Sequence, residues 1–301
     1  MIGHIVLNMR QMDWGDIKLF LALTRAGTVR RAGAQAGVSH STIARRIDQF
    51  EQRLGVKLLD RLPGGYSLTP AGEEMLEAAE RVEHELHAVQ RRLLGRDRQL
   101  AGKIRVTMID VLATKLLMPS LTEFSDTYPD IEIELLIGYE TVDLSKMEAD
   151  IALRATDRPA DHLIGRQVGT MAHAGYASPD YVKNHDLGDA GSANWIGFGR
   201  GDRFPRWVKQ SGFPHLPAKG IFESILLQIE AARSGMGIGF LPCFVGDRDP
   251  QLIRVDDKKN FPTYDLWLLR HPDTRQTARL SVFVEFMAEA IAQYAPLLEG
   301  E

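Results

Sequence analysis

The stretch Val38–Gly55, VSHSTIARRIDQFEQRLG, decides the fold of the N-terminal part of the chain. One side of it is apolar at spacings of four, three and four residues, as expected for one face of an amphipathic helix. The residues of that face are Ile43, Ile47, Phe50 and Leu54. Ser39 can cap the start of such a helix, and Gly55 can end it in a left-handed conformation. The stretch therefore predicts a helix that begins after Ser39 and ends at Gly55.

Two shorter helices are predicted before this one. Asp13 can cap a first helix that ends at Gly27, and Thr28 can cap a second. The second helix contains the small residues Ala32 and Gly33, which let another helix approach closely. Gly37 and Val38 then form a turn. Two short helices, a glycine-containing turn and a longer third helix predict a helix-turn-helix.

The outer face of the third helix carries the residues that could read DNA. Recognition helices meet base edges near their N-terminal end, where Ser41 and Arg45 lie one turn apart. Arg45 can donate two hydrogen bonds to a guanine, and Arg46 suits a phosphate. The alternative is an ordinary three-helix core with solvated charges. The candidate DNA-binding residues are Thr28, Arg30, Arg31, Ser39, His40, Ser41, Thr42, Arg45, Arg46, Gln49 and Arg61.

A hairpin is predicted after the third helix. Residues 57–60 and 66–69 have strand character, and Pro63-Gly64-Gly65 between them is a turn sequence. This hairpin would be the wing of a winged helix-turn-helix. Arg61 follows the first predicted strand, where it could bind a phosphate.

Residues from about 70 to 95 predict one long linker helix. Thr69 can cap it, and Pro70 suits the first helical position. Apolar residues then follow at alternating spacings of four and three, which is a heptad seam that favours pairing with a second copy. The candidate dimerisation residues are Met75, Ala79, Val82, Leu86, Val89 and Leu93. The alternative is packing on the same domain. His84 and His87 beside Glu83 do not make a convincing metal site, because this spacing is common on polar helical faces.

The charge distribution separates a basic head from an acidic body. Residues 12–70 hold nine Lys or Arg and five Asp or Glu, a net charge of +4. The remaining 27 basic and 35 acidic residues give −8, within a total of −4. A basic first fifth favours a head that contacts DNA and a body that does not.

Composition and motifs argue against several other classes of protein. No run approaches the roughly 18 apolar residues of a membrane helix, and residues 1–11 read as a tail, with Met1, Met9 or Met12 as the start. The single cysteine, Cys243, excludes an internal disulfide and fits the cytoplasm. An enzyme is the rival class. Cys243 lies in an apolar setting, and no nucleophile elbow, P-loop or dinucleotide fingerprint occurs. We expect no cofactor, no metal site and no catalytic residue.

The motifs together resemble those of the LysR-type transcriptional regulators. In the head the resemblance runs along 19–20, 26–28, 38–47, 50–51, 54–55, 58–61 and 68–72. In the C-terminal half it continues through 149–154, 176–181, 235–242, 266–269 and 271–272. It covers nearly the whole chain after Met12. The resemblance implies a sequence-specific regulator of promoter DNA whose activity depends on a small-molecule effector.

The chain departs from the family pattern at three places. The family usually has Gln-Pro or Gln-Ser after the capping serine, where this chain has His40-Ser41. Ala32-Gly33 stands where a paired alanine is usual, and Gly64 stands where the wing often carries a basic residue. These departures concern which bases are read and how firmly the wing binds DNA.

The C-terminal half alternates short apolar strands with helices, which predicts an α/β fold. The resemblance implies two Rossmann-like subdomains of the periplasmic-binding-protein type 2, with an effector cleft between them. We expect the winged helix-turn-helix at 12–70 and the linker helix at 71–101. Subdomain I is expected at 102–172 and 268–301, and subdomain II at 173–267. Strands are predicted at 104–108, 131–135, 150–153, 171–177, 220–223, 235–242 and 266–269.

Ligands of open α/β sheets bind beyond the carboxyl ends of strands. That rule nominates Ile109, Asp110, Arg154, Phe198, Gly199, Arg200, Glu223, Ser224 and Ile225 as effector-binding residues. Ser224 opens a helix whose amides favour an anion, whereas Asp110 and Glu223 suggest a positive or hydroxyl-bearing group. These two cues conflict, so the effector stays open. The expected partners are promoter DNA, the effector and further copies of the chain as a dimer and, by resemblance, a tetramer. RNA polymerase is a further candidate, and a membrane is not.

Overall fold

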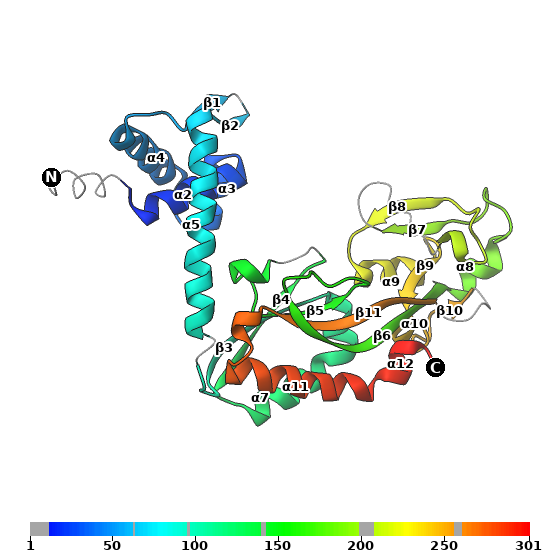
Figure 1. Cartoon of the computed structure of the whole chain (residues 1–301). Coiled ribbons are helices and arrows are strands. Elements are labelled where there is room, and N and C mark those ends of the chain that lie inside the picture. The colour runs from blue at the N-terminus through cyan, green and yellow to red at the C-terminus, as the bar shows by residue number, and fades with distance from the viewer. Residues whose placement is uncertain (1–11, 63, 95–96, 140–142, 199–207, 256–260) are drawn as a thin grey trace, which may run out of the picture. The chain divides into compact units, whose positions relative to one another are not determined.

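A computed structural model describes residues 12–62, 64–94, 97–139, 143–198, 208–255 and 261–301 (Figure 1). The predicted tail at 1–11, and Pro63, Gly199 and Arg200, lie outside these ranges. The chain divides into two compact units, the first ending at Val89 and the second beginning at Gln90. No helix in the described ranges combines the length and apolar character that crossing a membrane requires.

The first unit begins with the three predicted helices. They are α2 (Trp14–Ala26), α3 (Val29–Ala36) and α4 (His40–Leu54). Asp13, Thr28 and Ser39 cap them, each side chain accepting a hydrogen bond from a backbone N–H of the first turn. Gly33 allows the tight turn before α4, because a Cβ there would lie 2.8 Å from the Val38 carbonyl oxygen. The predicted helix-turn-helix is confirmed.

The wing is an antiparallel hairpin of β1 (Leu59–Leu62) and β2 (Gly65–Leu68). It begins two residues later than predicted at its first strand and one residue earlier at its second. The first strand is displaced because Glu51 of α4 is buried and accepts hydrogen bonds from the backbone N–H groups of Leu58 and Leu59, at 2.9 and 3.0 Å. These bonds fix the chain entering the wing against α4.

The linker helix α5 spans Pro70–Leu94. Thr69 caps it by accepting a hydrogen bond from the Gly72 backbone N–H at 3.0 Å. Gly72 is required by close approach, because a Cβ there would lie 2.0 Å from the Leu58 carbonyl oxygen. The last turn belongs to the second unit, where Arg91 is buried and contacts Asp273 and the Ser145 carbonyl.

The second unit is built on a seven-stranded mixed sheet. Its strands are β3 (Gly102–Met108), β4 (Ile131–Ile137), β5 (Ile151–Ala155), β6 (Ile164–Ala177), β9 (Gly239–Pro242), β10 (Ile253–Arg254) and β11 (Phe261–Arg270). β4, β3 and β5 are parallel, and β11 joins β5 antiparallel. The long strands β6 and β11 pair with each other (Figure 1). β6 carries the chain from a first lobe, which holds β3, β4 and β5, to a second lobe, which holds β9 and β10, and β11 returns the chain to the first lobe.

Helices cover one face of the first-lobe sheet. They are α6 (Asp110–Leu112), a π-helical turn η1 (Ala113–Leu117), α7 (Met118–Thr127), α11 (Ala278–Gln293) and α12 (Ala295–Glu299). Two short turns, η2 (Leu144–Lys146) and η4 (Pro272–Thr274), complete the lobe, and Leu144 of η2 packs on the other face of the sheet with Ala152 and Leu269. Phe124 of α7 meets Phe283 of α11 edge to face at 5.0 Å. The helix predicted around Leu116 to Phe124 therefore exists, with a π turn inside it.

The second lobe has its own small core around Trp195 and Tyr181. Its remaining elements are α8 (Pro179–Asn184), β7 (Trp195–Phe198), η3 (Val208–Gln210), β8 (Ala218–Phe222), α9 (Ile225–Arg233) and α10 (Cys243–Gly246). β7 and β8 are parallel, and a bridge from Trp195 to Ile238 joins them to the start of β9. The two-lobed α/β arrangement agrees with the prediction.

Two predicted strands have different limits in the structure. The strand predicted at 235–242 begins only at Gly239, since Gly235 and Gly237 have φ angles of 75° and 158°. The crossing strand predicted at 171–177 is twice as long, because it pairs with β11 back to Ile164. That pairing joins residues about 100 positions apart in the sequence.

Candidate functional site

The first candidate site is the outer face of α4. Ile43, Ile47 and Phe50 are buried, which leaves Ser41, Arg45 and Gln49 exposed on the opposite side, as the helical spacing predicts. Among the described residues, no side chain forms an ion pair with Arg45. The Arg45 guanidinium can therefore reach a partner outside the chain.

The start of α3 adds two more basic groups to this unit. Arg30 and Arg31 are exposed, and no ion pair to either is found within the described ranges. Thr28 is half-buried, and its hydroxyl accepts a hydrogen bond from the Arg31 backbone N–H at 3.3 Å. Exposed guanidinium groups beside a helix N-terminus suit phosphate oxygens.

The turn before α4 is exposed but internally bonded. The Ser39 hydroxyl lies 2.9 Å from the Ser41 hydroxyl and 2.8 Å from that of Thr42. His40 is exposed, and Thr42 is half-buried. These hydroxyls order the first turn of α4 and leave His40 and Ser41 accessible.

Two of the predicted phosphate contacts are held by acidic side chains of the same unit. Arg46 donates to the buried carboxylate of Asp16 at 2.6 and 3.0 Å, and Arg53 contacts the same carboxylate. Arg61 donates to both oxygens of Asp48, at 2.9 and 3.0 Å. Arg46 therefore joins α4 to α2, while Arg61 is exposed on β1 of the wing.

The second candidate site is an apolar surface on α5. Val82, Leu86, Val89 and Leu93 are 40–63% exposed. Met75 and Ala79 differ from the dimerisation prediction, since Met75 packs on the core of the head and Ala79 is buried. A groove continues from Val82 toward the exposed side chains of Met12 and Val56. Val82, Leu86 and Val89 thus continue this groove as an apolar strip on the described part of the first unit, and Leu93 lies on the last turn of α5, in the second unit.

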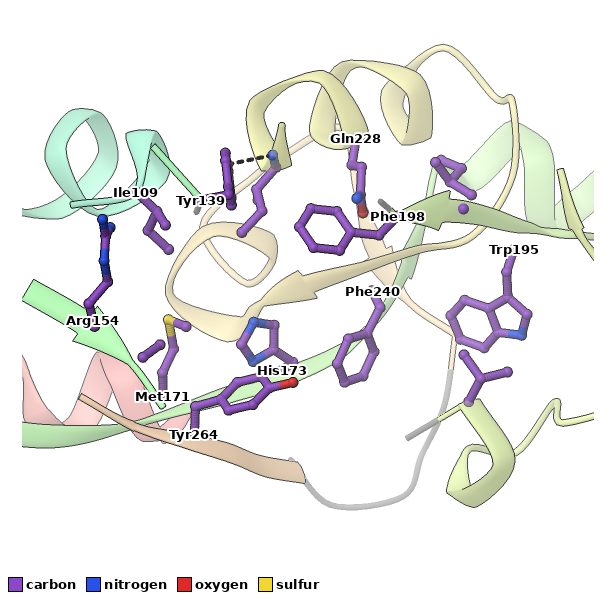
Figure 2. Close-up of a pocket in the computed structure, with 15 residues that line it drawn as sticks. Ile109, Tyr139, Arg154, Met171, His173, Trp195, Phe198, Gln228, Phe240 and Tyr264 are labelled. Atoms are coloured by element: carbon purple, nitrogen blue, oxygen red, sulfur yellow. Dashed lines mark hydrogen bonds between the residues drawn. The ribbon is translucent and has the colours of Figure 1, made fainter. Parts of the chain in front are cut away.

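The third candidate site is a cavity of about 340 Å³ between the two lobes of the second unit (Figure 2). First-lobe residues, crossing-strand residues and second-lobe residues all contribute to its wall. They are Ile109, Tyr139, Arg154, Ala155, Met171, His173, Trp195, Ile196, Gly197, Phe198, Val208, Ile225, Gln228, Phe240 and Tyr264. This volume lies at the lower end of the usual range for small-molecule pockets.

The cavity brings together four of the predicted effector-binding residues: Ile109, Arg154, Phe198 and Ile225. Asp110, Glu223 and Ser224 do not line it, and Gly199 and Arg200 lie outside the described residues. The expectation that ligands bind beyond the carboxyl ends of strands missed the cavity residues that lie within β6, β9 and β11. Their aromatic character was the available signal, but only the strand pairing shows which of them face inward.

The polar groups of the cavity are few. His173 is buried, stacks on Phe240 with ring centroids 5.2 Å apart, and has its pKa lowered to about 3 by burial. It is therefore neutral near pH 7. Arg154 donates hydrogen bonds to the Gly138 carbonyl at 2.9 Å and to the Thr107 hydroxyl at 2.8 Å.

A hydrogen-bonded network closes one side of the cavity and joins the two lobes. The Asp110 carboxylate accepts hydrogen bonds from the Ser224 hydroxyl at 2.6 Å and from the Tyr139 hydroxyl. The Tyr139 hydroxyl in turn accepts one from the Ile225 backbone N–H at 2.8 Å, drawn dashed in Figure 2. Burial raises the pKa of Tyr139, so its hydroxyl remains protonated and can donate to Asp110.

Neither metal chemistry nor thiol chemistry has a site among the described residues. No group of three or more His, Cys, Asp or Glu side chains there could hold a metal ion. Cys243 is buried, and burial raises the pKa of its thiol, which disfavours the reactive thiolate.

Two family models match the chain over the regions that hold these sites. Residues 14–73 match the bacterial regulatory helix-turn-helix proteins of the lysR family. Residues 97–292 match the LysR substrate binding domain. The second match alone spans more than half of the chain.

Curated relatives and solved structures agree with these matches. The regulator CrgA of Neisseria meningitidis is 26% identical over 92% of this chain and 96% of its own length. A putative transcriptional regulator of Pseudomonas aeruginosa is 30% identical over 78% and 80%. The full-length structure of AphB, a Vibrio cholerae virulence activator, shares the fold with a TM-score of 0.62 at 21% identity, covering 94% of this chain and all of that one. Both relatives bear the names of transcription regulators, which favours a regulator over the enzyme alternative.

Proposed function

Because this chain belongs to the LysR family and is a DNA-binding transcription regulator modulated by an effector, we propose that α4 reads its operator and that the effector binds in the interlobe cavity. The observation that carries the first assignment is Arg45, exposed on the outer face of α4 beside Ser41 and Gln49. A guanidinium at this place of a recognition helix can bind the O6 and N7 atoms of a guanine.

The other basic groups of the head serve affinity rather than sequence reading. Arg30 and Arg31 at the start of α3 bind phosphates, which fixes the head on the duplex. Arg61 already shares its charge with Asp48, so its pull on a phosphate is weaker than that of Arg30 or Arg31. Arg46 holds α4 against α2 by donating a hydrogen bond to Asp16.

Two copies pair through the apolar strip of α5. Val82, Leu86, Val89 and Leu93 carry the exposed apolar surface, and pairing removes it from water. Paired heads can then bind two half-sites of one operator. We extend this to a tetramer through the second units, with RNA polymerase as a further partner of the assembly.

The effector acts by favouring one arrangement of the two lobes. Asp110 and Tyr139 on the first lobe contact Ser224 and Ile225 on the second, so a ligand beside them changes how tightly the lobes close. A ligand shifts such an equilibrium only by its difference in affinity for the two states. Residues 102–172 with 268–301 and residues 173–267 are the two bodies we assign to this motion.

A footprint on the DNA beside the chain's own gene tests the proposal. The full-length protein is expected to protect two half-sites about one helical turn of 10–10.5 base pairs apart, as paired recognition helices require. Protection that is uniform along the fragment, or absent both with and without cell extract as a source of effector, would contradict it.

A further inference from the structure

The wall of the interlobe cavity is dominated by aromatic rings. Figure 2 shows His173, Phe240 and Tyr264 gathered on one side, with Phe198 and Gln228 opposite them. Phe198 also meets Tyr139 edge to face, with ring centroids 5.8 Å apart. Such walls favour a flat aromatic ligand, since stacked and edge-to-face ring pairs add about 0.5–1.5 kcal/mol beyond area burial.

The N-terminus of α9 is where a ligand anion would be held. The first hydrogen-bond donors at this end already have partners within the chain. The first N–H of α9, that of Ile225, donates to the Tyr139 hydroxyl, and the Ser224 hydroxyl donates to Asp110. The Asp110 carboxylate therefore supplies the negative charge that favours a helix N-terminus. Asp110 does not itself line the cavity, but it is bonded to the lining residue Tyr139, so a ligand carboxylate beside Ile225 would be repelled by its nearby charge and would find the first amide donor occupied.

The polar groups that face the cavity include two neutral side chains, Gln228 and His173, and one arginine. Gln228 is buried, and its Nε2 donates to the Phe222 carbonyl at 3.2 Å. His173 is neutral near pH 7 and can offer a hydrogen bond but no charge. Arg154 is the single charged side chain among the described lining residues, and it donates to Thr107 and Gly138 of its own lobe.

We propose that the effector of this regulator is an uncharged aromatic molecule, held between the rings of Phe198 and Phe240 and excluded from carrying a carboxylate by Asp110. This inference rests on the proposed function, because it names the class of ligand for the same cavity. It resolves the conflict between the two sequence cues: the helix at Ser224 does attract an anion, and that anion is the chain's own Asp110.

Matched pairs of probes test the charge preference. Calorimetric titration of the full-length protein, without DNA, would compare indole with indole-3-carboxylate and benzyl alcohol with benzoate. The uncharged member of each pair is expected to bind at least about tenfold more tightly. Tighter binding of the carboxylates would overturn the proposal, and so would a failure of all four probes to bind at millimolar concentration.

Variants show whether the probes bind in this cavity. Phe198→Ala is expected to weaken indole binding about tenfold, whereas Leu227→Ala, an exposed position on α9, leaves it unchanged. Equal affinities in both variants would place the ligand elsewhere and overturn the assignment.

The exclusion by Asp110 has a test of its own. Asp110→Asn removes the carboxylate charge, so benzoate is expected to gain at least about tenfold in affinity while benzyl alcohol changes less than about threefold. An unchanged preference would contradict the role of Asp110. All these titrations omit DNA, so their failure is distinguishable from a failure of the operator footprint, which needs no added probe.

Discussion

Arg45 is the residue on which sequence reading most depends in the proposed function. It is exposed on α4, and within the described ranges no carboxylate neutralises it. Arg45→Ala is expected to weaken specific operator binding by about 1–3 kcal/mol, the usual cost of losing a base contact. Fluorescence anisotropy with operator DNA measures this change.

The matched control for Arg45 lies on the same helix. Gln52 is exposed nearer the C-terminal end of α4, so Gln52→Ala is expected to leave operator affinity unchanged. If both variants bind operator as the parent does, α4 does not read bases through Arg45.

Glu51 holds the wing in place from inside the head. Its buried carboxylate accepts the backbone N–H groups of Leu58 and Leu59, and it also pairs with Lys57 at 2.5 Å. Glu51→Ala leaves two buried donors without a partner, so the head is expected to lose about 1–3 kcal/mol of stability. Urea unfolding followed by circular dichroism measures the loss, and Gln52→Ala again serves as the control. A loss no larger than that of the control would show that the wing is held by other contacts.

His173 makes the second unit sensitive to acid. Its pKa is lowered to about 3 by burial, whereas an unfolded histidine titrates near 6.5. Between pH 6.5 and 3, His173 is therefore protonated in the unfolded chain and neutral in the folded chain. The free energy of unfolding falls as the pH drops through this range.

Replacing His173 with an aromatic residue that does not titrate isolates its contribution to the acid sensitivity. His173→Phe is expected to flatten the fall in unfolding free energy between pH 6.5 and 4.5, by up to about 1.4 kcal/mol per pH unit. Urea unfolding at a series of pH values measures both slopes. Parallel curves for the parent and the variant would show that His173 does not cause the acid sensitivity.

The proposed dimer interface lies on the linker helix. Val82, Leu86, Val89 and Leu93 follow one another along α5 with 40–63% of each side chain exposed. Leu86→Asp places a charge in this strip and is expected to convert the dimer to monomer at micromolar concentration, as sedimentation velocity would show. His84→Asp adds the same charge at an exposed position outside the seam and is the control. A Leu86→Asp protein that sediments as the parent does would remove this strip from the interface.

At the scale of elements, the sequence predicts those whose signals are local. Asp13, Thr28 and Ser39 are capping residues that sit directly before their helices, so the starts of α2, α3 and α4 follow from the sequence. The strand at 235–242 was predicted too long because its apolar pattern hides two glycines with positive φ. Local patterns identify an element, but backbone conformation sets where a strand can begin.

The candidate sites differ in how far they can be predicted. The outer face of α4 follows from helical spacing, because Ile43 and Ile47 define the inner face. The cavity does not, since Tyr264 and His173 face it only through the pairing of β11 with β6. The internal pairing of Arg46 with Asp16 is also invisible to spacing, as the two lie 30 positions apart.

At the scale of the whole molecule, the two parts of the chain differ in the sign of their net charge. Residues 12–70 carry a net charge of +4 and the remainder −8. Binding to DNA releases counterions from the phosphates, so operator affinity is expected to fall steeply as salt rises. The cavity proposed for the effector lies in the acidic part of the chain.

If the head of this chain recognises one DNA sequence, it must bind the promoter fragment beside the chain's own gene more tightly than a scrambled fragment. Fluorescence anisotropy at two salt concentrations measures the ratio of the two affinities. We expect a ratio of about a thousand or more, with both affinities falling as salt rises. A ratio near one at both salt concentrations, for the parent as for Arg45→Ala, would contradict it.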